Sequence, residues 1–475
     1  MTAAVAGGVL AGANGAGATT GTGRGSTELP SQPPEAAAGW STARGGPGQT
    51  GAVGFRDGFG EDFAFDSLET DWTADAEALP VVDDGTVYLS TEGTVRALDA
   101  ADGTLEWQCE EIGASGQPTV AYGTVYVGCG DTVTALDAAS GAVRWETAVA
   151  DADDATVGSL TVAFGMGYVF AAGRLTAIDC ETGAIEWTRS AVELSTGDPW
   201  EEARTVERSL ERDVVAADGC VFTIAEQGTI VGLEPLTGEP KLTIGTNYYY
   251  LYDLVAMGGR VVVRTESEVV AAYDSETGER EGTWNGGVRR VAVRGDTLVF
   301  VTRYELVAID LESGEKRWSV GKYSHAIGVP VIACDVVLVG FGLQGRQYEN
   351  CLVAFDIDDG SEQWVRSRSD SAHVGERCVV ADRTIYIDDG GVTAIRAVSE
   401  DCDEDEDDDE KSEHWHDDDR PENRPTERRD DDQRRQRRDD WSSHFWVRDR
   451  AANGDANSDR GRRRVSSWLK LLCRR

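Results

Sequence analysis

Histidine and cysteine are the side chains most often used as bases, nucleophiles and metal ligands, and this chain places few of them where such chemistry is expected. His325 and His373 stand near the starts of expected strands, where a structural role is the simpler interpretation. His414 and His416 lie among acidic residues and are a candidate weak site for a divalent cation. His444 completes the set. We therefore predict no catalytic histidine.

The cysteines are spread out rather than clustered. They are Cys109, Cys129, Cys180, Cys220, Cys334, Cys351, Cys378, Cys402 and Cys473. No two are adjacent, and none form Cys-x-x-Cys, so neither a metal site nor a redox pair is predicted. Several lie in apolar runs, which favours a role as small buried hydrophobic residues. The sequence also has no nucleotide-binding loop, serine elbow or zinc-protease motif. We assign no catalytic residue and no metal ligand, and any cofactor-binding residue stays unknown.

The element that organises the chain is a repeated turn. The pattern Ala-Leu-Asp-x-x-x-Gly-x-x-x-Trp first occurs from Ala97 to Trp107. Its Asp position recurs about every 40 residues, with Glu in the fourth copy and Arg in the eighth: Asp99, Asp137, Asp179, Glu234, Asp274, Asp310, Asp356 and Arg396. This period is typical of a four-stranded propeller blade. The fourth and fifth copies are degraded, with Leu242 at one Trp position and a displaced Trp284 in the other.

Strand-like segments with alternating β-branched and aromatic residues precede each turn, and no useful helical periodicity appears. The sequence therefore predicts an all-β fold, an eight-bladed propeller, with seven blades as the alternative. The last repeat lacks a Trp strand after Arg396, whereas Trp72 precedes the first repeat unpaired. We expect the strand at Trp72 to complete the last blade, which closes the ring and removes exposed sheet edges.

The repeated residues have structural roles. The Asp is expected to accept backbone N–H groups of its own turn, and the Gly to adopt positive φ. The Trp is expected to fill the wedge between blades and to donate its indole N–H to a carbonyl. Since these residues recur around the ring, they are scaffold, and function is expected where the pattern breaks.

The chain divides into three parts. Residues 1–39 are an apolar leader and a spacer rich in Gly, Ala and Pro, residues 40–400 form the propeller, and 401–475 are a tail rich in Asp and Arg that is expected to be disordered. The stretch 1–13 resembles an export signal without its positive n-region. An extracytoplasmic location with a truncated signal is expected; a flexible leader on a cytoplasmic protein is the alternative.

Acidic residues dominate the charge. There are 85 Asp and Glu against 45 Lys and Arg, a net charge of −40. Such a surface repels nucleic acid and anionic membranes, and no apolar run is long enough to span a membrane. The composition, rich in acid and poor in lysine, resembles that of proteins from salt-accumulating haloarchaea. A halophilic monomer is predicted.

The repeat from Ala97 to Trp107 and its copies resemble the PQQ-like propeller repeat, a family that includes quinoprotein alcohol dehydrogenases and the propeller lipoprotein of bacterial outer-membrane assembly. The segment from Trp40 through Arg44 to Gly51 looks like a degenerate form of a motif that precedes such propellers. The resemblance implies Trp-docked blades. Its dehydrogenase members carry an adjacent Cys-Cys ring, a Ca²⁺ site and an Asp base, and this chain has no Cys-Cys pair. No cofactor is therefore expected, with PQQ and Ca²⁺ as the alternative.

Three irregular segments are candidate contact sites. The insert at 192–212 is charged and is expected to be a solvated loop or short surface helix. Tyr248, Tyr249, Tyr250 and Tyr252 are expected to be half buried, or else exposed for protein or glycan contacts. The segment 341–350 is expected to form a hairpin extension near the channel mouth. The function predicted is a non-catalytic scaffold for protein or cell-surface partners, and the alternative is a quinoprotein-type oxidoreductase or another enzyme that uses the central funnel.

Overall fold

The computed structural model describes residues 40–53, 68–76, 78–150, 156–196, 204–285, 288, 290–302, 304–321, 328–341, 346–367, 378–388 and 391–397. The tail at 401–475 and all five histidines lie outside these ranges, as do Cys402 and Cys473. The predictions made for them are therefore untested.

Seven sheets make up the described part of the chain. The first sheet contains β3 (Val81–Asp83), β4 (Thr86–Thr91), β5 (Gly93–Asp99), β6 (Leu105–Ala121), β7 (Thr124–Cys129), β8 (Thr132–Asp137) and β9 (Val143–Ala148). The second contains β10 (Val157–Ala163), β11 (Met166–Ala171), β12 (Arg174–Asp179) and β13 (Ile185–Arg189). The third contains β14 (Ala191–Thr196), β15 (Arg204–Ala217), β16 (Cys220–Ala225), β17 (Thr229–Leu233) and β18 (Pro240–Gly245).

The remaining sheets follow the same meander. The fourth contains β19 (Leu251–Met257), β20 (Arg260–Thr265), β21 (Val269–Asp274) and β22 (Arg280–Asn285), and the fifth β23 (Arg290–Arg294), β24 (Thr297–Val301), β25 (Glu305–Asp310) and β26 (Lys316–Gly321). The sixth contains β1 (Ala52–Val53), β27 (Val331–Ala333), β28 (Val336–Gly340), β29 (Cys351–Asp356) and β30 (Glu362–Ser367). The seventh contains β2 (Leu68–Ala74), β31 (Cys378–Ala381), β32 (Thr384–Asp388) and β33 (Val392–Ala397).

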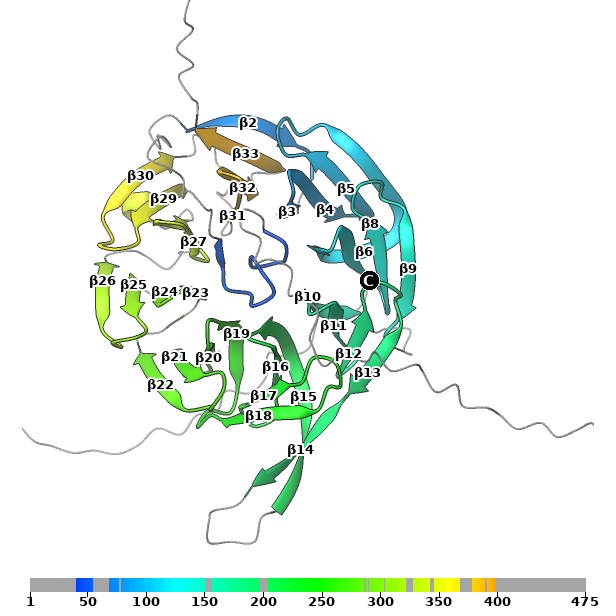
Figure 1. Ribbon diagram of the computed structural model, residues 1–475. Helices are drawn as coiled ribbons and strands as arrows, with labels where there is room; N and C mark the ends of the chain where they lie inside the picture. The colour runs from blue at the N-terminus through cyan, green and yellow to red at the C-terminus, as the bar shows by residue number, and fades with distance from the viewer. Residues whose placement is uncertain are drawn as a thin grey trace, which may run out of the picture. The chain divides into compact units, whose positions relative to one another are not determined.

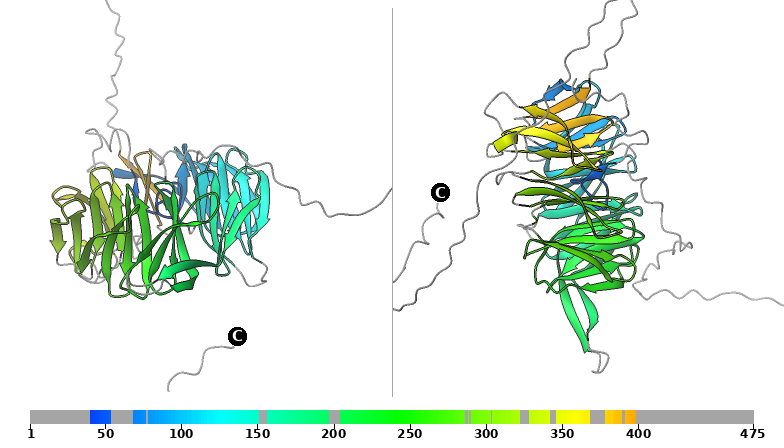
Figure 2. Two further views of the ribbon diagram at one scale, coloured as in Figure 1. Left: turned by 60° about the horizontal axis from the view of Figure 1, so that its bottom comes forward. Right: turned by 90° about the vertical axis from the view of Figure 1, so that its left-hand side faces the viewer.

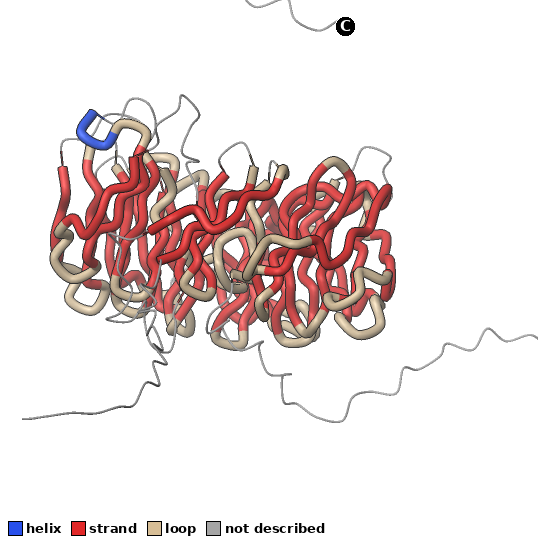
Figure 3. Tube along the Cα trace, turned by 90° about the horizontal axis from the view of Figure 1, so that it is seen from above, coloured by secondary structure: helices blue, strands red, loops and turns tan. Residues whose placement is uncertain are grey.

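The sheets follow one another around a ring, with the turns gathered on its two faces (Figures 1 and 3). Within a sheet the strands run from the centre outward. Middle strands such as β16 are buried at every position, whereas outer strands such as β18 alternate between buried and exposed residues. This pattern follows from packing each sheet between two neighbours, and it confirms the all-β prediction.

Strand β6 belongs to two successive units of the ring. Its first half pairs with β5, for example Ala97 with Trp107, and its second half pairs with β7, for example Val120 with Val125. The register shifts between these halves, so one continuous strand passes from the outer edge of one unit to the inner edge of the next. The innermost strands are therefore β3, the second half of β6, β10, the second half of β15, β19, β23, β27 and β31.

The ring is closed by strands from the two ends of the propeller. Strand β2 pairs antiparallel with β33, with Trp72 opposite Ala394, as predicted. Arg396, the residue that replaces Asp in the eighth turn, donates from Nη1 to the carbonyl of Ala101 at 3.0 Å and forms an ion pair with Asp71 at 2.9 Å. The substitution that degrades the eighth turn therefore joins the last strand to the first repeat.

The tryptophans dock between units as predicted. The indole Nε1 of Trp107 donates to the carbonyl of Ala138 at 2.9 Å, and the ring lies against Gly141, where an added Cβ would be 2.4 Å away. The corresponding indoles contact the next turn in the same way: Trp72 with Ala100, Trp145 with Cys180, Trp187 with Pro235 and Trp318 with Ile357. The displaced Trp284 still reaches the next turn but donates to Gly314.

The acidic turn residues cap their own turns as predicted. Oδ1 of Asp137 accepts the N–H of Ser140 at 3.0 Å, and Oε2 of Glu234 performs the same role for Thr237 at 2.7 Å. The turn glycines adopt positive φ, for example 69° at Gly141. The longer Glu side chain therefore preserves the fourth turn.

The expectation for the insert at 192–212 was wrong. The insert at 192–212 is a β-hairpin formed by β14 and the first half of β15, and it projects outward from the rim of the ring (Figures 1 and 2). Val192 and Leu194 point into the core while Glu193 is exposed, and this alternation favours strand pairing over a helix. The segment 341–350 connects β28 and β29, which pair as an antiparallel hairpin, and its described part contains the buried Phe341 and a 3₁₀ turn at Arg346–Tyr348.

Candidate functional site

Residues 40–53, which we call the central segment, lie in the middle of the ring (Figure 1). Their fold is compact because Thr42 Oγ1 donates to the carbonyls of Gly45 at 2.9 Å and Gly46 at 3.0 Å, and Gly51 N–H donates to Arg44 O at 2.8 Å. The segment ends in β1, which pairs in parallel with β27. The motif noticed in the sequence is therefore a plug within the channel.

Main-chain hydrogen bonds attach the central segment to six inner strands. In each of these strands, the residue four positions before the start of the next strand donates its N–H to a carbonyl of the segment. The pairs are Val82 with Trp40, Val120 with Ser41, Ala216 with Pro47, Ala256 with Gly48, Val293 with Thr50 and Ile332 with Gly51. The donor–acceptor distances lie between 2.9 and 3.0 Å. The inner strands thus present a ring of equivalent N–H donors, and the carbonyl groups of the central segment accept their hydrogen bonds.

The fit is tightest at Gly48. A Cβ added there would lie 2.0 Å from the carbonyl oxygen of Ala256, so only glycine allows this approach. At Gly46, by contrast, an added Cβ would meet nothing within 4 Å. The segment is therefore seated at one specific point against β19.

Two inner strands, β10 and β31, make no such bond among the described residues. The positions equivalent to the six donors are Val162 and Val380. Each of these strands instead borders a cavity beside the central segment. The cavities thus lie beside the two inner strands to which the central segment is not hydrogen-bonded.

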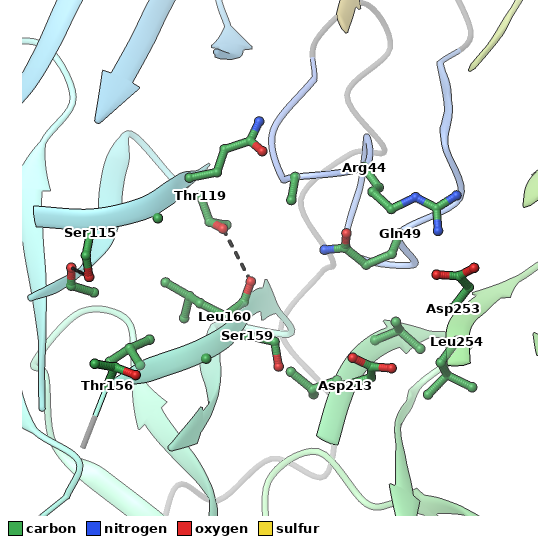
Figure 4. A pocket seen from close by; sticks show the side chains of 18 residues that line it. Arg44, Gln49, Ser115, Thr119, Thr156, Ser159, Leu160, Asp213, Asp253 and Leu254 are labelled. Atoms are coloured by element: carbon green, nitrogen blue, oxygen red, sulfur yellow. Dashed lines mark hydrogen bonds between the residues drawn. The ribbon is translucent and has the colours of Figure 1, made fainter. Parts of the chain in front are cut away.

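The larger cavity has a volume of about 520 Å³ and lies between the central segment and β10 (Figure 4). Its polar lining includes Arg44 and Gln49 from the segment, and Gln117, Ser159, Asp213 and Asp253 from the inner strands. The last four occupy equivalent positions in their strands. Each lies three residues before the position that donates, or in β10 would donate, its N–H to the central segment. Volumes of this size are typical of small-ligand sites.

The two aspartates are held at bulges. Both have positive φ, 55° at Asp213 and 50° at Asp253, and the register of each strand shifts at that point. A bulge turns a side chain away from the regular alternation of a strand. Both carboxylates consequently point into the cavity (Figure 4).

Of the two carboxylates in the cavity, one has an ion-pair partner and the other has none among the described residues. Asp253 pairs with Arg264 at 2.7 Å, and the guanidinium of Arg264 lies 4.8 Å from the ring centre of Tyr252. Arg44 donates to the carbonyl of Val291. Burial raises the pKa of Asp213, and the nearby Asp253 raises it further, although Arg212 and Arg44 oppose the shift. Asp213 itself accepts no hydrogen bond and forms no ion pair within the described ranges.

The smaller cavity, about 300 Å³, lies on the other side of Gln49 and is bordered by β31. It shares Arg44, Gln49 and Asp253 with the larger cavity and adds Arg290 and Trp40. Trp40 is only 2% exposed, and its indole Nε1 has no hydrogen-bond partner.

The other residues singled out in the sequence lie elsewhere. Tyr249 and Tyr250 are 58% and 45% exposed and stack edge to face at 4.7 Å, so of the two expectations for this segment exposure holds at these positions. The seven described cysteines are free; Cys109 and Cys129 are half-buried and the other five buried, which confirms the prediction for those five. Sequence reasoning missed Asp213, Asp253 and Gln49. The only available signal was that polar residues recur at one register position of the inner strands.

Proteins bind Ca²⁺ through several carboxylate and carbonyl oxygens, and such ligands can be sought only in the described part of the chain. No group of three or more His, Cys, Asp or Glu side chains is placed to hold a metal ion there. The middle of the ring, where the units converge, is filled by the central segment. No helix in the described ranges has the length and apolar character needed to cross a membrane.

A ring of antiparallel sheets with docked tryptophans defines a β-propeller. The family model described as outer membrane protein assembly factor BamB matches residues 18–213 and 199–399, so the chain belongs to this family. No curated protein matches the sequence.

Solved structures show the same fold. The quinohemoprotein alcohol dehydrogenase from Comamonas testosteroni is similar with a TM-score of 0.54 and 16% identity, over 74% of this chain and 76% of that one. The quinohemoprotein alcohol dehydrogenase ADHIIG from Pseudomonas putida HK5 has a TM-score of 0.54 and 13% identity, over 76% and 80%. The computationally designed Ika8 protein has a TM-score of 0.53 and 14% identity, over 70% and 100%. At these identities the likeness concerns the fold alone.

Proposed function

We propose that this chain is a non-catalytic, exported, eight-bladed scaffold that binds a protein or cell-surface partner without PQQ or Ca²⁺. The observation that carries the proposal is the occupation of the channel by the chain's own residues 40–53, bonded to six inner strands. An enzyme that uses the funnel needs that space for cofactor and substrate. The eight-blade count is supported by the inner strands, because β6 and β15 each supply one with their second halves.

The surface proposed for the partner is the face of the ring at which the inner strands begin. The open cavity is lined by Asp213 and Asp253, which lie at the bulges of the inner strands β15 and β19. The β14–β15 hairpin is a second candidate contact. Its exposed face carries Glu193 directly opposite Glu207, a like-charged cross-strand pair that weakens the hairpin itself.

The net charge of −40 supports the haloarchaeal-type, monomeric part of the proposal. Strong self-repulsion keeps copies apart and disfavours nucleic acid and anionic lipid as partners. The relationship to the outer-membrane assembly factor family is the reason to favour a partner that is a protein.

The decisive experiment compares binding with redox activity. Partners are captured from a high-salt extract of cell-surface material on the immobilised full chain, and the strongest is purified and titrated. We expect saturable binding that the heat-unfolded chain lacks. In parallel, the chain is incubated with PQQ and Ca²⁺ and assayed with primary alcohols and a dye acceptor. Alcohol-dependent dye reduction would overturn the proposal and favour the quinoprotein alternative.

A further inference from the structure

The larger cavity contains polar groups that the protein leaves without partners. Asp213 accepts no hydrogen bond and the amide of Gln49 has none, within the described ranges. The hydroxyl oxygen of Ser159 is inaccessible to solvent and has no hydrogen-bond partner among the residues that the structure describes. A buried hydroxyl without a partner is costly, so its presence points to a group that completes the site. All three residues line the same cavity (Figure 4).

The neighbouring polar groups are already used. Gln117 donates to the carbonyl of Pro80 at 2.9 Å, Thr119 to that of Leu160 at 3.3 Å, and Ser115 to that of Gly128 at 3.2 Å. Asp253 is paired with Arg264. The unused capacity is therefore found at Asp213, Gln49 and Ser159, with the exposed Thr156 on the same lining, and it consists mainly of acceptor oxygens.

The charge of this unused set is negative. The Asp213 carboxylate is its one charged group. Arg44 also lines the cavity and keeps its positive charge, while its guanidinium donates to the Val291 carbonyl. A carboxylate, an amide oxygen and a hydroxyl together suit a cationic group with several N–H donors.

We propose that the cavity between the central segment and β10 binds a primary ammonium or guanidinium group, held by Asp213 with Gln49 and Ser159. The proposal rests on the binding function proposed above and names the chemical group that the partner supplies. Such a group reaches the site on a small amine or on a Lys or Arg side chain of a partner protein.

The bulge makes the key variant feasible. Asn tolerates positive φ about as well as Asp, so Asp213→Asn keeps the backbone at 55° while it removes the charge. Ser159→Ala removes the buried hydroxyl without adding volume. Glu193→Gln on the exposed hairpin is the matched control, since it removes one exposed carboxylate that does not line the cavity.

Calorimetric titration of the full chain with agmatine tests the cation, and N-butylurea serves as its neutral counterpart. We expect agmatine to bind one equivalent, Asp213→Asn to weaken it at least tenfold, Ser159→Ala to weaken it several-fold, and Glu193→Gln to leave it unchanged. N-butylurea is expected not to bind. Absence of agmatine binding, equal binding of N-butylurea, or an unchanged affinity in Asp213→Asn would each overturn the proposal.

The source of the cation is distinguished with the capped peptide acetyl-Gly-Arg-Gly-amide. Competition of this peptide with agmatine assigns the site to a protein side chain, whereas exclusion of the peptide assigns it to a free amine. The failure of this proposal also differs from that of the proposed function. If a captured partner binds Asp213→Asn as well as it binds the natural chain, the scaffold role stands and the cation site does not.

Discussion

The indole Nε1 of Trp72 donates to the carbonyl oxygen of Ala100 at 3.1 Å, and an added Cβ at Gly103 would lie 2.7 Å from the indole. Trp72 pairs within the sheet of the last repeat but docks onto the turn of the first. The same geometry joins Trp107 to Ala138 and Gly141 within the ring. The contact between the last and the first repeat, which we call the closing seam, thus has the same geometry as a contact between two neighbouring repeats inside the ring.

Substitution at Trp72 tests this closure. Trp72→Ala is expected to lower the free energy of unfolding by about 3–5 kcal/mol because a large buried side chain is lost. Trp72→Phe, which mainly removes the hydrogen bond, is expected to cost about 1 kcal/mol. Both are measured by denaturant unfolding in high salt. Trp107→Phe is the matched control, and a ring that does not depend on closure would respond to it but not to Trp72→Phe.

A single added methyl group at Gly48 tests how the central segment is held in the ring. Gly48→Ala brings a Cβ against the carbonyl of Ala256 and is expected to destabilise the chain by on the order of 2 kcal/mol. Hydrogen exchange should then quicken at the amides of Ala216, Ala256 and Val293. Gly46→Ala, whose Cβ meets nothing within 4 Å, should leave exchange unchanged. Equal rates of amide hydrogen exchange in the two variants would contradict a tight fit of the central segment at Gly48.

Asp83 gives the closing seam a pH dependence. Burial raises its pKa to about 6, and Asp84 and Asp382 add to the shift. Since the folded chain holds this proton more tightly than the unfolded one, stability falls as pH rises from about 4 to about 6. Asp83→Asn should therefore stabilise the chain at pH 7, by about 1 kcal/mol after solvent screening, and have no such effect near pH 3.5.

Asp137 is a control for Asp83, because its pKa is shifted in the opposite direction. Its bond to Arg144 lowers its pKa to about 2. Its contribution to stability is complete above about pH 4 and is lost as the pH falls towards 2. Asp137→Asn should therefore destabilise the chain at pH 7 and not at pH 2. A gain in stability for both variants at pH 7 would show that the charge of Asp83 is not the cause.

Salt should govern stability throughout. The Debye length falls from about 30 Å at 0.01 M to about 3 Å at 1 M, so the repulsion implied by a net charge of −40 is screened only in concentrated salt. The thermal midpoint measured by circular dichroism is expected to rise steeply between these concentrations. A midpoint independent of salt would contradict the halophilic proposal.

The repeated turns predicted the fold because Asp, Gly and Trp each have a geometric role that depends on the nearby chain. Arg396 showed how a departure from the pattern is also informative, since its contacts with Asp71 and Ala101 seal the ring. The hairpin at 192–212 was missed because its charges outweighed the alternation of Val192 and Leu194. The position of the central segment could not be predicted, because its attachment uses main-chain atoms that leave no trace in side-chain identity.

The central segment also has a consequence for the order in which the protein forms during synthesis. Trp40 precedes every strand to which the segment is bonded, and the most distant donors to the segment, Ile332 and Cys334, follow Trp40 by almost 300 residues. Contacts of such separation are slow to form because the intervening chain must first be ordered. The first part of the described chain to leave the ribosome is therefore among the last to be fixed in place. Until then, the channel stays open and its main-chain donors are exposed to water.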